Sequence, residues 1–411
     1  MAEIRPFKGI LYNVSRVSME DVLAPPYDVI TPEFREALYM QSPYNIVRID
    51  FGREEPGDSE TENKYIRARR YLDAWRDEGI FIQSEKPSYY VYEMSYKIGG
   101  ARKSLIGFLG LVKLEELGKG SVFPHECTHS KPKQDRLNLM RACEANTSPI
   151  FSLYKSSDRQ VPDLLSRTAQ TIPYIEAADV AGDIHRLWRI DQEEQVAVIT
   201  RELADKSIFI ADGHHRYETA YEFYREMISK DPSVSGPFDH VLMFLADMRD
   251  EGLTILPTHR LLKTVPEDLD RLLSEHFRTE PVDNGFDISE RLCGKKDVFG
   301  FYKRGARIWH MLTYKGDGNL SDVPANLQDI DVMILHELIF KTLLHTTDIG
   351  YEMDVERALD KIRNGQFEAA FFLNPTKVED VEKSALSSVR MPPKSTYFYP
   401  KLMTGLVINK F

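Results

Sequence analysis

The chain contains 411 residues, too many for one ordinary hydrophobic core, so two or three domains are expected. Hydrophobic residues make up 42% of the chain and charged residues 28%, a balance typical of soluble globular proteins. The formal net charge of −11 argues against general nucleic-acid binding, although a local basic pocket for a small anion remains compatible with it.

Cysteine usage and the N-terminus favour a cytoplasmic protein. Cys127, Cys143 and Cys293 are odd in number and show no Cys-x-x-Cys spacing, which fits a reducing compartment. Residues 1–11 have no apolar core followed by a small-residue cleavage site, so no signal peptide is expected. No run approaches about eighteen consecutive apolar residues, so no membrane span and no membrane partner are expected.

The first predicted domain, residues 1–85, is an α/β segment. Residues 24–30 read Ala-Pro-Pro-Tyr-Asp-Val-Ile and predict a stiff, extended loop that presents Tyr27 and Asp28. A helix is predicted from residue 62 to residue 78, because apolar residues recur on one face and Gly79 stands where a helix would end.

The second predicted domain, residues 86–262, contains the clearest hairpin. Two strands rich in aromatic and β-branched residues, 89–96 and 104–112, flank Gly99-Gly100. Residues 160–203 are read as mixed helix and strand. The remaining expected elements are a helix at 133–145 and strands at 149–154, 208–211, 240–246 and 253–262.

The third predicted domain, residues 263–411, is an α+β portion, so the fold class is mixed α/β. Its expected elements are a helix at 266–275, a hairpin at 298–312, a helix at 328–344, a strand at 367–373 and a helix at 376–386. Residues 391–400 predict a stiff, extended segment that carries Lys394, Ser395 and Thr396.

The stretch Asp212-Gly213-His214-His215-Arg216 separates a buried strand from an amphipathic helix that is apparent from Tyr217 onward. Gly213 allows a tight turn, and a helix that follows it points free N–H groups and its positive dipole end outward. These N–H groups, together with the two histidines and the arginine, predict a phosphate site. In the alternative interpretation, Asp212 is an ordinary N-cap and the histidines are merely solvated.

Residues 125–129, His-Glu-Cys-Thr-His, spell the H-E-x-x-H pattern of zinc metalloproteases. Pro124 and Pro132 bracket the stretch, so the long amphipathic helix that this pattern requires is disfavoured. A loop that presents Glu126 as a general base is the preferred interpretation.

Together these clusters suggest phosphoryl transfer, which needs phosphate donors, charge stabilisation and a group to take the hydroxyl proton. Residues 213–216 can hold phosphates, Glu126 can act as base, and residues 394–396 can hold the transferred group or an acidic substrate. The sequence has no Walker A motif and no protein-kinase motif set.

Over nearly its whole length the sequence resembles a prokaryotic domain-of-unknown-function family, the one numbered one thousand and fifteen. The stretches that carry this resemblance are 25–28, 124–126, 135–137, 211–216, 256–260 and 394–400.

A more distant resemblance links the turn at 212–216 to the ParB/sulfiredoxin-like superfamily, whose free-serine kinase branch combines Pro-His-Glu, Asp-Gly-His-His-Arg and a hydroxyl-rich Pro-Lys segment in this order. Here these are residues 124–126, 212–216 and 393–396. The resemblance implies a central ParB/sulfiredoxin-like domain, ATP or ADP with Mg²⁺, and Glu126 as base. His214 stands where sulfiredoxin needs a cysteine, and no DNA-reading motif of a ParB protein is found.

The predicted function is therefore a small-molecule kinase that transfers a phosphoryl group from ATP or ADP to free L-serine or a similar metabolite. The alternative is a non-catalytic nucleotide sensor. Asp212 would orient a histidine or Mg²⁺, and residues 213–216 would hold phosphates. Substrate-side residues would be His125, Lys394, Ser395 and Thr396, with Asp28, Arg136, His259 and Arg260 as second-tier candidates. The phosphate donor, the acceptor, the metal ligands and the oligomeric state stay open, as does the question whether the three motifs converge in space.

Overall fold

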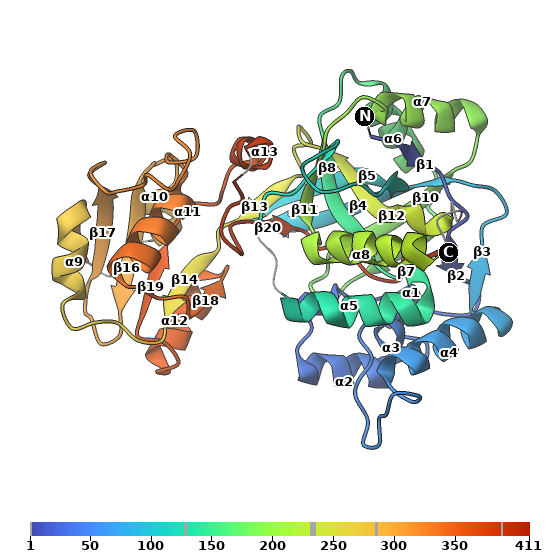
Figure 1. Ribbon diagram of the computed structural model, residues 1–411, viewed down its shortest axis with the longest axis horizontal. Helices are drawn as coiled ribbons and strands as arrows, with labels where there is room; N and C mark the ends of the chain where they lie inside the picture. The colour runs from blue at the N-terminus through green and yellow to red at the C-terminus, as the bar shows by residue number, and fades with distance from the viewer. Residues whose placement is uncertain (1, 127–129, 231–235, 284–286, 388) are drawn as a thin grey trace. The chain divides into compact units, whose positions relative to one another are not determined.

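The computed structural model describes residues 2–126, 130–230, 236–283, 287–387 and 389–411 (Figure 1). It confirms the mixed α/β class. The chain forms two compact units: unit 1 comprises residues 1–124, 128–254 and 400–411, and unit 2 comprises residues 125–127 and 255–399. Most of the first two predicted segments fall in unit 1 and most of the third in unit 2, and the division into three domains stays a prediction.

Unit 1 is built on a nine-stranded mixed sheet in the order β6-β11-β8-β12-β5-β4-β10-β9, with β1 paired to β5. The predicted hairpin is confirmed, and Gly99 and Gly100 both adopt the positive φ that its two-residue turn requires. The strands are β1 (Ile4–Arg5), β4 (Tyr89–Ile98), β5 (Ala101–Lys113), β6 (Val122–Phe123), β8 (Ile150–Tyr154), β9 (Ile175–Ala178), β10 (Ile184–Ile190), β11 (Ile208–Asp212) and β12 (His240–Asp247).

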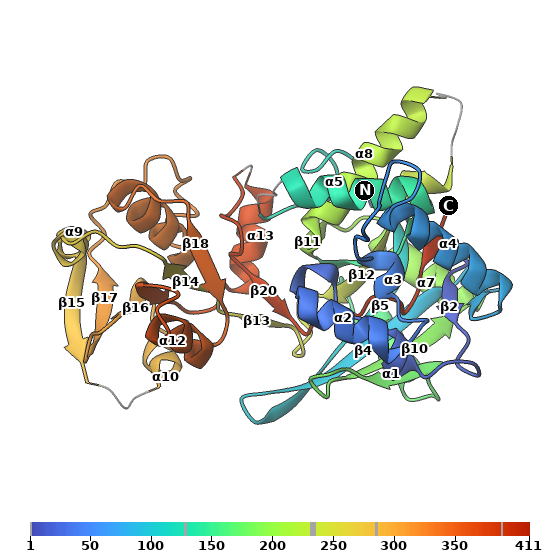
Figure 2. The same cartoon turned by 90° about the horizontal axis from the view of Figure 1, so that it is seen from below.

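Helices pack around this sheet, with α8 against β8, α5 beside α8 and α4 beside α5 (Figures 1 and 2). The helices are α1 (Met19–Val22), α2 (Pro32–Gln41), α3 (Val47–Asp50), α4 (Lys64–Asp77), α5 (Ser130–Cys143), α6 (Gln160–Ala169), α7 (Glu193–Leu203) and α8 (His214–Lys230), with 3₁₀ turns η1 (Tyr27–Val29) and η2 (Pro237–Asp239). Two small pairs join β2 (Ile10–Tyr12) to β3 (Phe81–Gln83) and β7 (Ala145–Asn146) to β21 (Asn409–Lys410).

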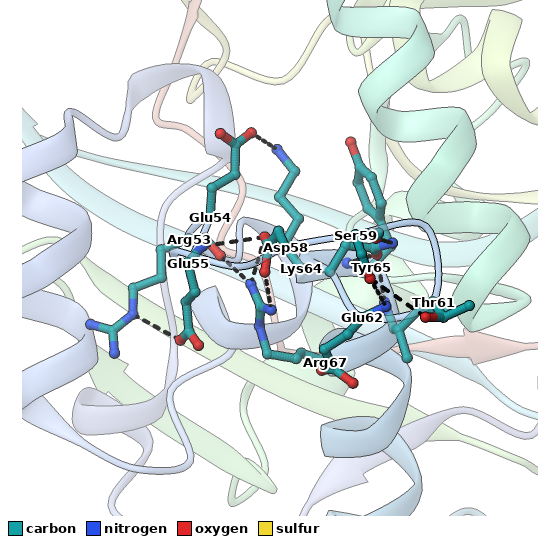
Figure 3. Close-up of polar contacts among 12 residues, drawn as sticks. Arg53, Glu54, Glu55, Asp58, Ser59, Thr61, Glu62, Lys64, Tyr65 and Arg67 are labelled. Carbon is teal, nitrogen blue, oxygen red and sulfur yellow. Dashed lines mark hydrogen bonds and ion pairs between the residues drawn. The ribbon is translucent and has the colours of Figure 1, made fainter.

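The start of α4 shows how local side chains set a helix boundary (Figure 3). The predicted helix at 62–78 is confirmed with a slightly later start, because the Asn63 side chain caps it by accepting hydrogen bonds from the N–H groups of Tyr65 and Ile66 at 3.0 and 3.2 Å. Within the first turn, Arg67 pairs with Asp58 and fastens the preceding loop to the helix.

Unit 2 contains a six-stranded antiparallel sheet in the order β15-β17-β16-β19-β14-β18 (Figure 2). The sheet strands are β14 (His259–Leu262), β15 (Phe277–Val282), β16 (Val298–Lys303), β17 (Trp309–Tyr314), β18 (Ile349–Glu352) and β19 (Ala369–Phe372), and β13 (Thr254–Leu256) pairs with β20 (Tyr397–Tyr399). The helices are α9 (Leu269–His276), α10 (Ile288–Leu292), α11 (Asp331–Met333), α12 (Val355–Arg363) and α13 (Val378–Leu386), with a π-helix η3 (Ile334–Leu343).

Three expectations for unit 2 need correction. The segment expected to be extended at 391–400 turns at residues 393–395, where Lys394 has a φ of +59°. The strand expected at 253–262 is broken at Pro257-Thr258 into β13 and β14, because proline has no N–H group for a ladder hydrogen bond. The helix expected at 328–344 is a short α-helix followed by a π-helix, a type of helix that apolar periodicity alone does not distinguish. The hairpin expected at 298–312 is confirmed as β16 and β17.

Within the described residues, no helix has both the length and the apolar character that crossing a membrane requires.

Candidate functional site

The Asp212–Arg216 turn forms at the end of β11, and α8 begins at His214, three residues earlier than the apolar pattern indicates. Gly213 has a φ of +95°, a conformation that side-chain-bearing residues rarely adopt. A Cβ atom at this position would also lie 2.9 Å from the Arg216 Nε atom. The turn therefore needs glycine for both its backbone conformation and the room that Arg216 occupies.

The carboxylate of Asp212 is fixed from two sides. Its Oδ1 atom accepts a hydrogen bond from the Gly213 N–H at 2.8 Å, and its Oδ2 atom lies 2.8 Å from the ammonium group of Lys401. Lys401 belongs to the C-terminal segment that is part of unit 1. The Asp212 side chain thus enters an ion pair, in addition to any contact with the helix start.

His214 is buried and His215 is half-buried at the start of α8. The α8 N–H groups beside them belong to the first turn of a 17-residue helix, where such groups lack partners within the helix. One turn further on, Glu218 pairs with Lys133 of α5 and fixes the two helices to each other.

Arg216 and Arg136 line one small cavity of about 30 Å³, enough for a water molecule or two. The Arg216 guanidinium group donates to the carbonyl oxygen of Pro149. Asp50 and Thr147 line the same cavity, and the Thr147 hydroxyl donates to Asp50 Oδ1 at 2.6 Å. Two guanidinium groups and a polar wall therefore lie next to the Asp212–Arg216 turn.

Arg136 is almost fully buried, and three groups compensate its charge. It donates to the carbonyl oxygen of Asp50 at 2.7 Å and pairs with the carboxylates of Asp50 at 3.4 Å and Asp135 at 2.6 Å. Its guanidinium group also lies 4.2 Å from the ring centre of Tyr27. The buried pair and its hydrogen bonds hold Arg136 in one position.

The loop that carries Tyr27 and Asp28 belongs to the same polar region. Burial raises the pKa of Tyr27 to about 12, the positive charges of Arg136 and Arg216 oppose this rise, and the negative charges of Asp28 and Asp212 add to it. Charges act on a phenol in this way only over short distances. Two second-tier candidates, Asp28 and Arg136, thus lie near the predicted phosphate-binding turn.

In unit 2, Glu126 is bound to residues 394–396. Its Oε1 atom accepts hydrogen bonds from the Thr396 N–H at 3.0 Å and the Thr396 hydroxyl at 2.9 Å, and its Oε2 atom accepts one from the Lys394 N–H at 3.2 Å. Lys394 has a φ of +59°, which brings its N–H and that of Thr396 toward the same carboxylate. Glu126 and the Lys-Ser-Thr segment, which lie far apart in the sequence, thus form one cluster.

His125 is fully buried beside this cluster, with its Nε2 atom 2.9 Å from the Thr396 hydroxyl. Residues 125 and 126 lie in an extended segment, because Glu126 forms a parallel β-bridge with Met391 and the Met391 N–H donates to the His125 carbonyl oxygen at 2.8 Å. They therefore do not lie on a helix face as in an H-E-x-x-H metalloprotease. His129, the last residue of that pattern, is outside the described residues.

Arg260 lies in the same cluster, fully buried. It donates to the carbonyl oxygens of Thr258 and Lys394 and stacks on Tyr351, with 5.0 Å between its guanidinium carbon and the ring centre. Burial lowers the pKa of Arg260 to about 10, and the charge of Glu126 opposes this change. Burial and the charge of Arg260 also lower the pKa of its neighbour His259, to about 4, so the imidazole is neutral.

Ser395 has a structural role in this cluster. Its hydroxyl is buried and donates to the carbonyl oxygen of Pro392 at 2.7 Å, and its own carbonyl oxygen accepts from the Thr376 hydroxyl at 2.7 Å. The candidate residues thus form two sets, each assembled within one unit: Asp28, Arg136 and residues 212–216 in unit 1, and residues 125, 126, 259, 260 and 394–396 in unit 2. Their catalytic roles stay predictions.

The sequence model of a family described as a protein of unknown function, DUF1015, matches residues 4–333. The chain belongs to the DUF1015 family. The matched region contains Glu126, the Asp212–Arg216 turn and Arg260, and it ends before residues 394–396.

Solved structures give matches at low identity to this DUF1015 chain. A conserved hypothetical protein from Pyrococcus furiosus is 14% identical, with 70% of this chain and 92% of that one covered and a TM-score of 0.35. A free serine kinase in complex with AMP is 12% identical, with coverages of 71% and 98% and a TM-score of 0.35. SbnI with a C-terminal truncation from Staphylococcus aureus is 10% identical, with coverages of 72% and 85% and a TM-score of 0.36. A comparison with curated proteins finds no match.

Lys401, Asp50 and Tyr351, which contact residues of the two sets, were not predicted from the sequence. Lys401 follows the stretch 394–400 directly and is a cation next to a recognised motif, which is a usable signal. Asp50 ends the largely apolar run 46–50, where a carboxylate is unexpected in a buried position. Tyr351 had no signal, because it reaches Arg260 only through the pairing of β14 with β18.

Proposed function

We propose that this DUF1015 protein transfers a phosphoryl group from ATP or ADP to the hydroxyl group of free L-serine or a similar small metabolite. The observation that carries the proposal is the Asp212–Arg216 turn. It combines a positive-φ glycine, the N-terminal turn of a 17-residue helix and the guanidinium group of Arg216. Such a combination suits nucleotide phosphates. The ordered motifs Pro-His-Glu, Asp-Gly-His-His-Arg and Pro-Lys-Ser-Thr support the same class by resemblance.

In this proposal the residues of the turn bind the phosphates, and Arg216 stabilises the charge that develops on the transferred group. The guanidinium group of Arg136, which lines the same small cavity as Arg216, is already compensated by Asp50 and Asp135, so we assign it a positioning role toward Tyr27. Asp212, fixed by Lys401 and by the Gly213 N–H, presents a carboxylate at the turn in one orientation.

Mg²⁺ enters the proposal through the family resemblance. Asp212 and Asp28 supply carboxylate oxygens, the ligands that Mg²⁺ prefers, and the charges of both act on Tyr27. These two side chains would hold the ion. When bound, it would neutralise part of the phosphate charge during transfer.

Glu126 is the proposed general base. The Thr396 hydroxyl donates to its Oε1 atom at 2.9 Å, which is the distance and donor type that a base needs toward an acceptor hydroxyl. Residues 394–396 would then orient the acceptor or the new phosphate, with His125 beside them.

The same contacts favour a second candidate function. Both carboxylate oxygens of Glu126 already accept hydrogen bonds from residues 394–396. In a non-catalytic nucleotide sensor, Glu126 would only hold residues 394–396 in place through these hydrogen bonds. Turnover separates the two functions.

The test is ³¹P NMR of the purified full-length protein with Mg²⁺, ATP or ADP, and free hydroxylated metabolites led by L-serine. A new phosphomonoester signal that disappears in Glu126→Gln and persists in Glu267→Gln supports the kinase. Glu267 is an exposed glutamate of unit 2 and serves as the matched control. Nucleotide binding without product from any acceptor would overturn the kinase and favour the sensor.

A further inference from the structure

Arg260 in β14 is a buried cation in an unusual setting. Its side chain is 1% exposed, and arginine is almost never fully buried without a carboxylate partner. Among the residues that the structure describes, its hydrogen bonds go to the carbonyl oxygens of Thr258 and Lys394, and none goes to a carboxylate. Burial lowers the pKa of Arg260 only to about 10, so the guanidinium group keeps its charge at neutral pH. The fold therefore carries the free-energy cost of burying this charge.

Lys394 connects this cation to the Glu126 carboxylate. Its carbonyl oxygen accepts a hydrogen bond from Arg260 Nη2 at 3.0 Å, and its N–H donates to Glu126 Oε2 at 3.2 Å. Lys394 has a φ of +59°, an uncommon conformation for a residue that has a side chain. The two hydrogen bonds hold the backbone of this one residue at its N–H and at its carbonyl group. The Arg260 contact thus helps to aim the Lys394 N–H at Glu126.

The charges of Arg260 and Glu126 also act on each other. The negative charge of Glu126 favours the charged form of Arg260. Burial raises the pKa of Tyr351, the ring on which Arg260 stacks; the charge of Arg260 opposes this rise and that of Glu126 adds to it. Because such a coupling is mutual, the charge of Arg260 favours the ionised form of Glu126 by the same free energy.

Other ionisable groups surround Glu126 as well, and they are those of His125, Tyr351, Arg390 and Lys394. His125 Nε2 lies 3.5 Å from Glu126 Oε1. Lys394 is exposed and Arg390 is half-buried, so solvent screens their charges more than that of Arg260. The buried guanidinium group is therefore the best shielded of these three positive charges.

We propose that Arg260 is a positioning residue for Glu126: it fixes Lys394 in the conformation that presents an N–H to the carboxylate, and it keeps that carboxylate ionised. The ionised carboxylate is the form that can take a proton from an acceptor hydroxyl. The role of Glu126 as base rests on the proposed kinase function. The effect of Arg260 on the ionisation of Glu126 does not.

The first test follows the Glu126 carboxyl carbon by ¹³C NMR during a pH titration of the full-length protein labelled with ¹³C-glutamate. The Glu126 signal is the one that is absent in Glu126→Gln. Arg260→Met removes the charge and should raise the titration midpoint by about one pH unit, the lower end of the effect of a nearby opposite charge. Arg260→Lys keeps the charge and should shift the midpoint by less than half as much. Arg363→Met, which removes a 54% exposed arginine of α12, is the matched control and should leave it unchanged.

Turnover gives the second readout. In the proposed kinase, the acidic limb of kcat/KM against pH should move to higher pH in Arg260→Met by the same amount, with a loss of about tenfold on that limb. If Arg260→Met does not fold, Arg260→Gln decides, since its amide keeps donors for the carbonyl oxygens. An unchanged midpoint in the neutral variants, or equal shifts in Arg260→Met and Arg260→Lys, would overturn the proposal. A shifted midpoint without turnover in any form of the protein would support the role of Arg260 and overturn the kinase function.

Discussion

Lys401 Nζ lies 2.8 Å from Asp212 Oδ2, and this ion pair fastens the C-terminal segment to the turn that begins α8. Both side chains are largely shielded, with exposed fractions of 14% for Lys401 and 25% for Asp212. Two charges in such a place interact more strongly than a pair in open solvent, so the loss of one partner costs more than at the surface. The C-terminal segment therefore contributes to the geometry of the candidate phosphate site.

Replacement of Lys401 by Met should lower the free energy of unfolding by about 1–2 kcal/mol, because Asp212 keeps its charge in a partly buried position. Urea unfolding followed by circular dichroism measures this loss. Lys410→Met is the matched control, since Lys410 pairs with Glu144, whose side chain is 49% exposed. The control should cost less than about 0.5 kcal/mol. Equal losses in the two variants would show that the Asp212–Lys401 ion pair contributes no more to stability than the more exposed Lys410–Glu144 pair.

Gly213→Ala should destabilise the protein by about 2–3 kcal/mol, because the new Cβ atom meets Arg216 at a φ of +95°. Gly118→Ala separates the two causes. Gly118 also has a positive φ, of +77°, but a Cβ atom there meets nothing within 4 Å. Its substitution should cost only about 1 kcal/mol from backbone strain. The difference between the two unfolding midpoints reports the extra loss of stability caused by displacing Arg216. Equal midpoints would contradict the close packing of the turn.

Local patterns predicted the elements whose causes are local. Gly99-Gly100 between two aromatic-rich runs specifies a two-residue hairpin, and the hairpin has that turn. The strand–glycine–helix pattern around Gly213 likewise specified the turn between β11 and α8. The start of α8 was placed too late, because His214 to Arg216 contribute no apolar periodicity even though they are helical.

Contacts between distant residues were beyond the reach of the same patterns. Nothing around Lys401 indicates that it pairs with Asp212, and the burial of Arg260 beneath Tyr351 follows from strand order rather than from the sequence near either residue. The order of motifs in a resembling family placed Glu126 and Thr396 in one chemistry but left open whether they meet in space. The hydrogen bonds between them come from a β-bridge to Met391 that has no local signature.

Asp331 in unit 2 gives a pH-dependent prediction. Burial raises its pKa from 3.8 to about 6, so the folded state disfavours the charged carboxylate. The free-energy cost of burying the charged Asp331 carboxylate is full above about pH 6. It disappears as the pH falls toward the unfolded-state pKa near 4. Asp331→Asn should therefore stabilise the protein by about 2–3 kcal/mol at pH 7 and have no effect near pH 4. The Asp297 N–H, which donates to Asp331 Oδ1 at 2.9 Å, keeps an acceptor in the variant.

The difference between variant and wild type must be measured at each pH, because His259 acts in the opposite direction. Its folded-state pKa of about 4 lies below the usual 6.5, so wild-type stability falls as the pH drops from about 6.5 to 4. This loss is common to both proteins and cancels in the difference. Asp329→Asn is the control, since Lys296 and Lys383 outweigh burial and lower the pKa of Asp329. The control should not stabilise the protein at pH 7, and a gain equal to that of Asp331→Asn would contradict the assigned cause.

Thr396 allows the two proposed functions to be separated at the level of one hydroxyl group. Its Oγ1 atom donates to Glu126 Oε1 at 2.9 Å and lies 2.9 Å from His125 Nε2. Thr396→Val removes this hydroxyl at nearly constant volume and leaves the hydrogen bond from the residue 396 N–H to Glu126 in place. Thr396→Ser retains the hydroxyl and loses a methyl group. In the proposed kinase, Thr396→Val should lower kcat about tenfold or more, because Glu126 loses its orientation as base. Thr396→Ser should keep a kcat close to that of wild type.

Nucleotide affinity completes this comparison. Glu126 and Thr396 are assigned to the hydroxyl side of the reaction, so Thr396→Val should leave the dissociation constant for ADP within about twofold of wild type. Isothermal titration calorimetry with ADP and Mg²⁺ measures it on the same preparations. Thr404→Val is the matched control, because Thr404 is also a buried threonine and belongs to unit 1. Equal turnover in Thr396→Val and Thr396→Ser would show that the Thr396 hydroxyl takes no part in the reaction. Glu126 would then only hold residues 394–396 in place, as expected of the sensor.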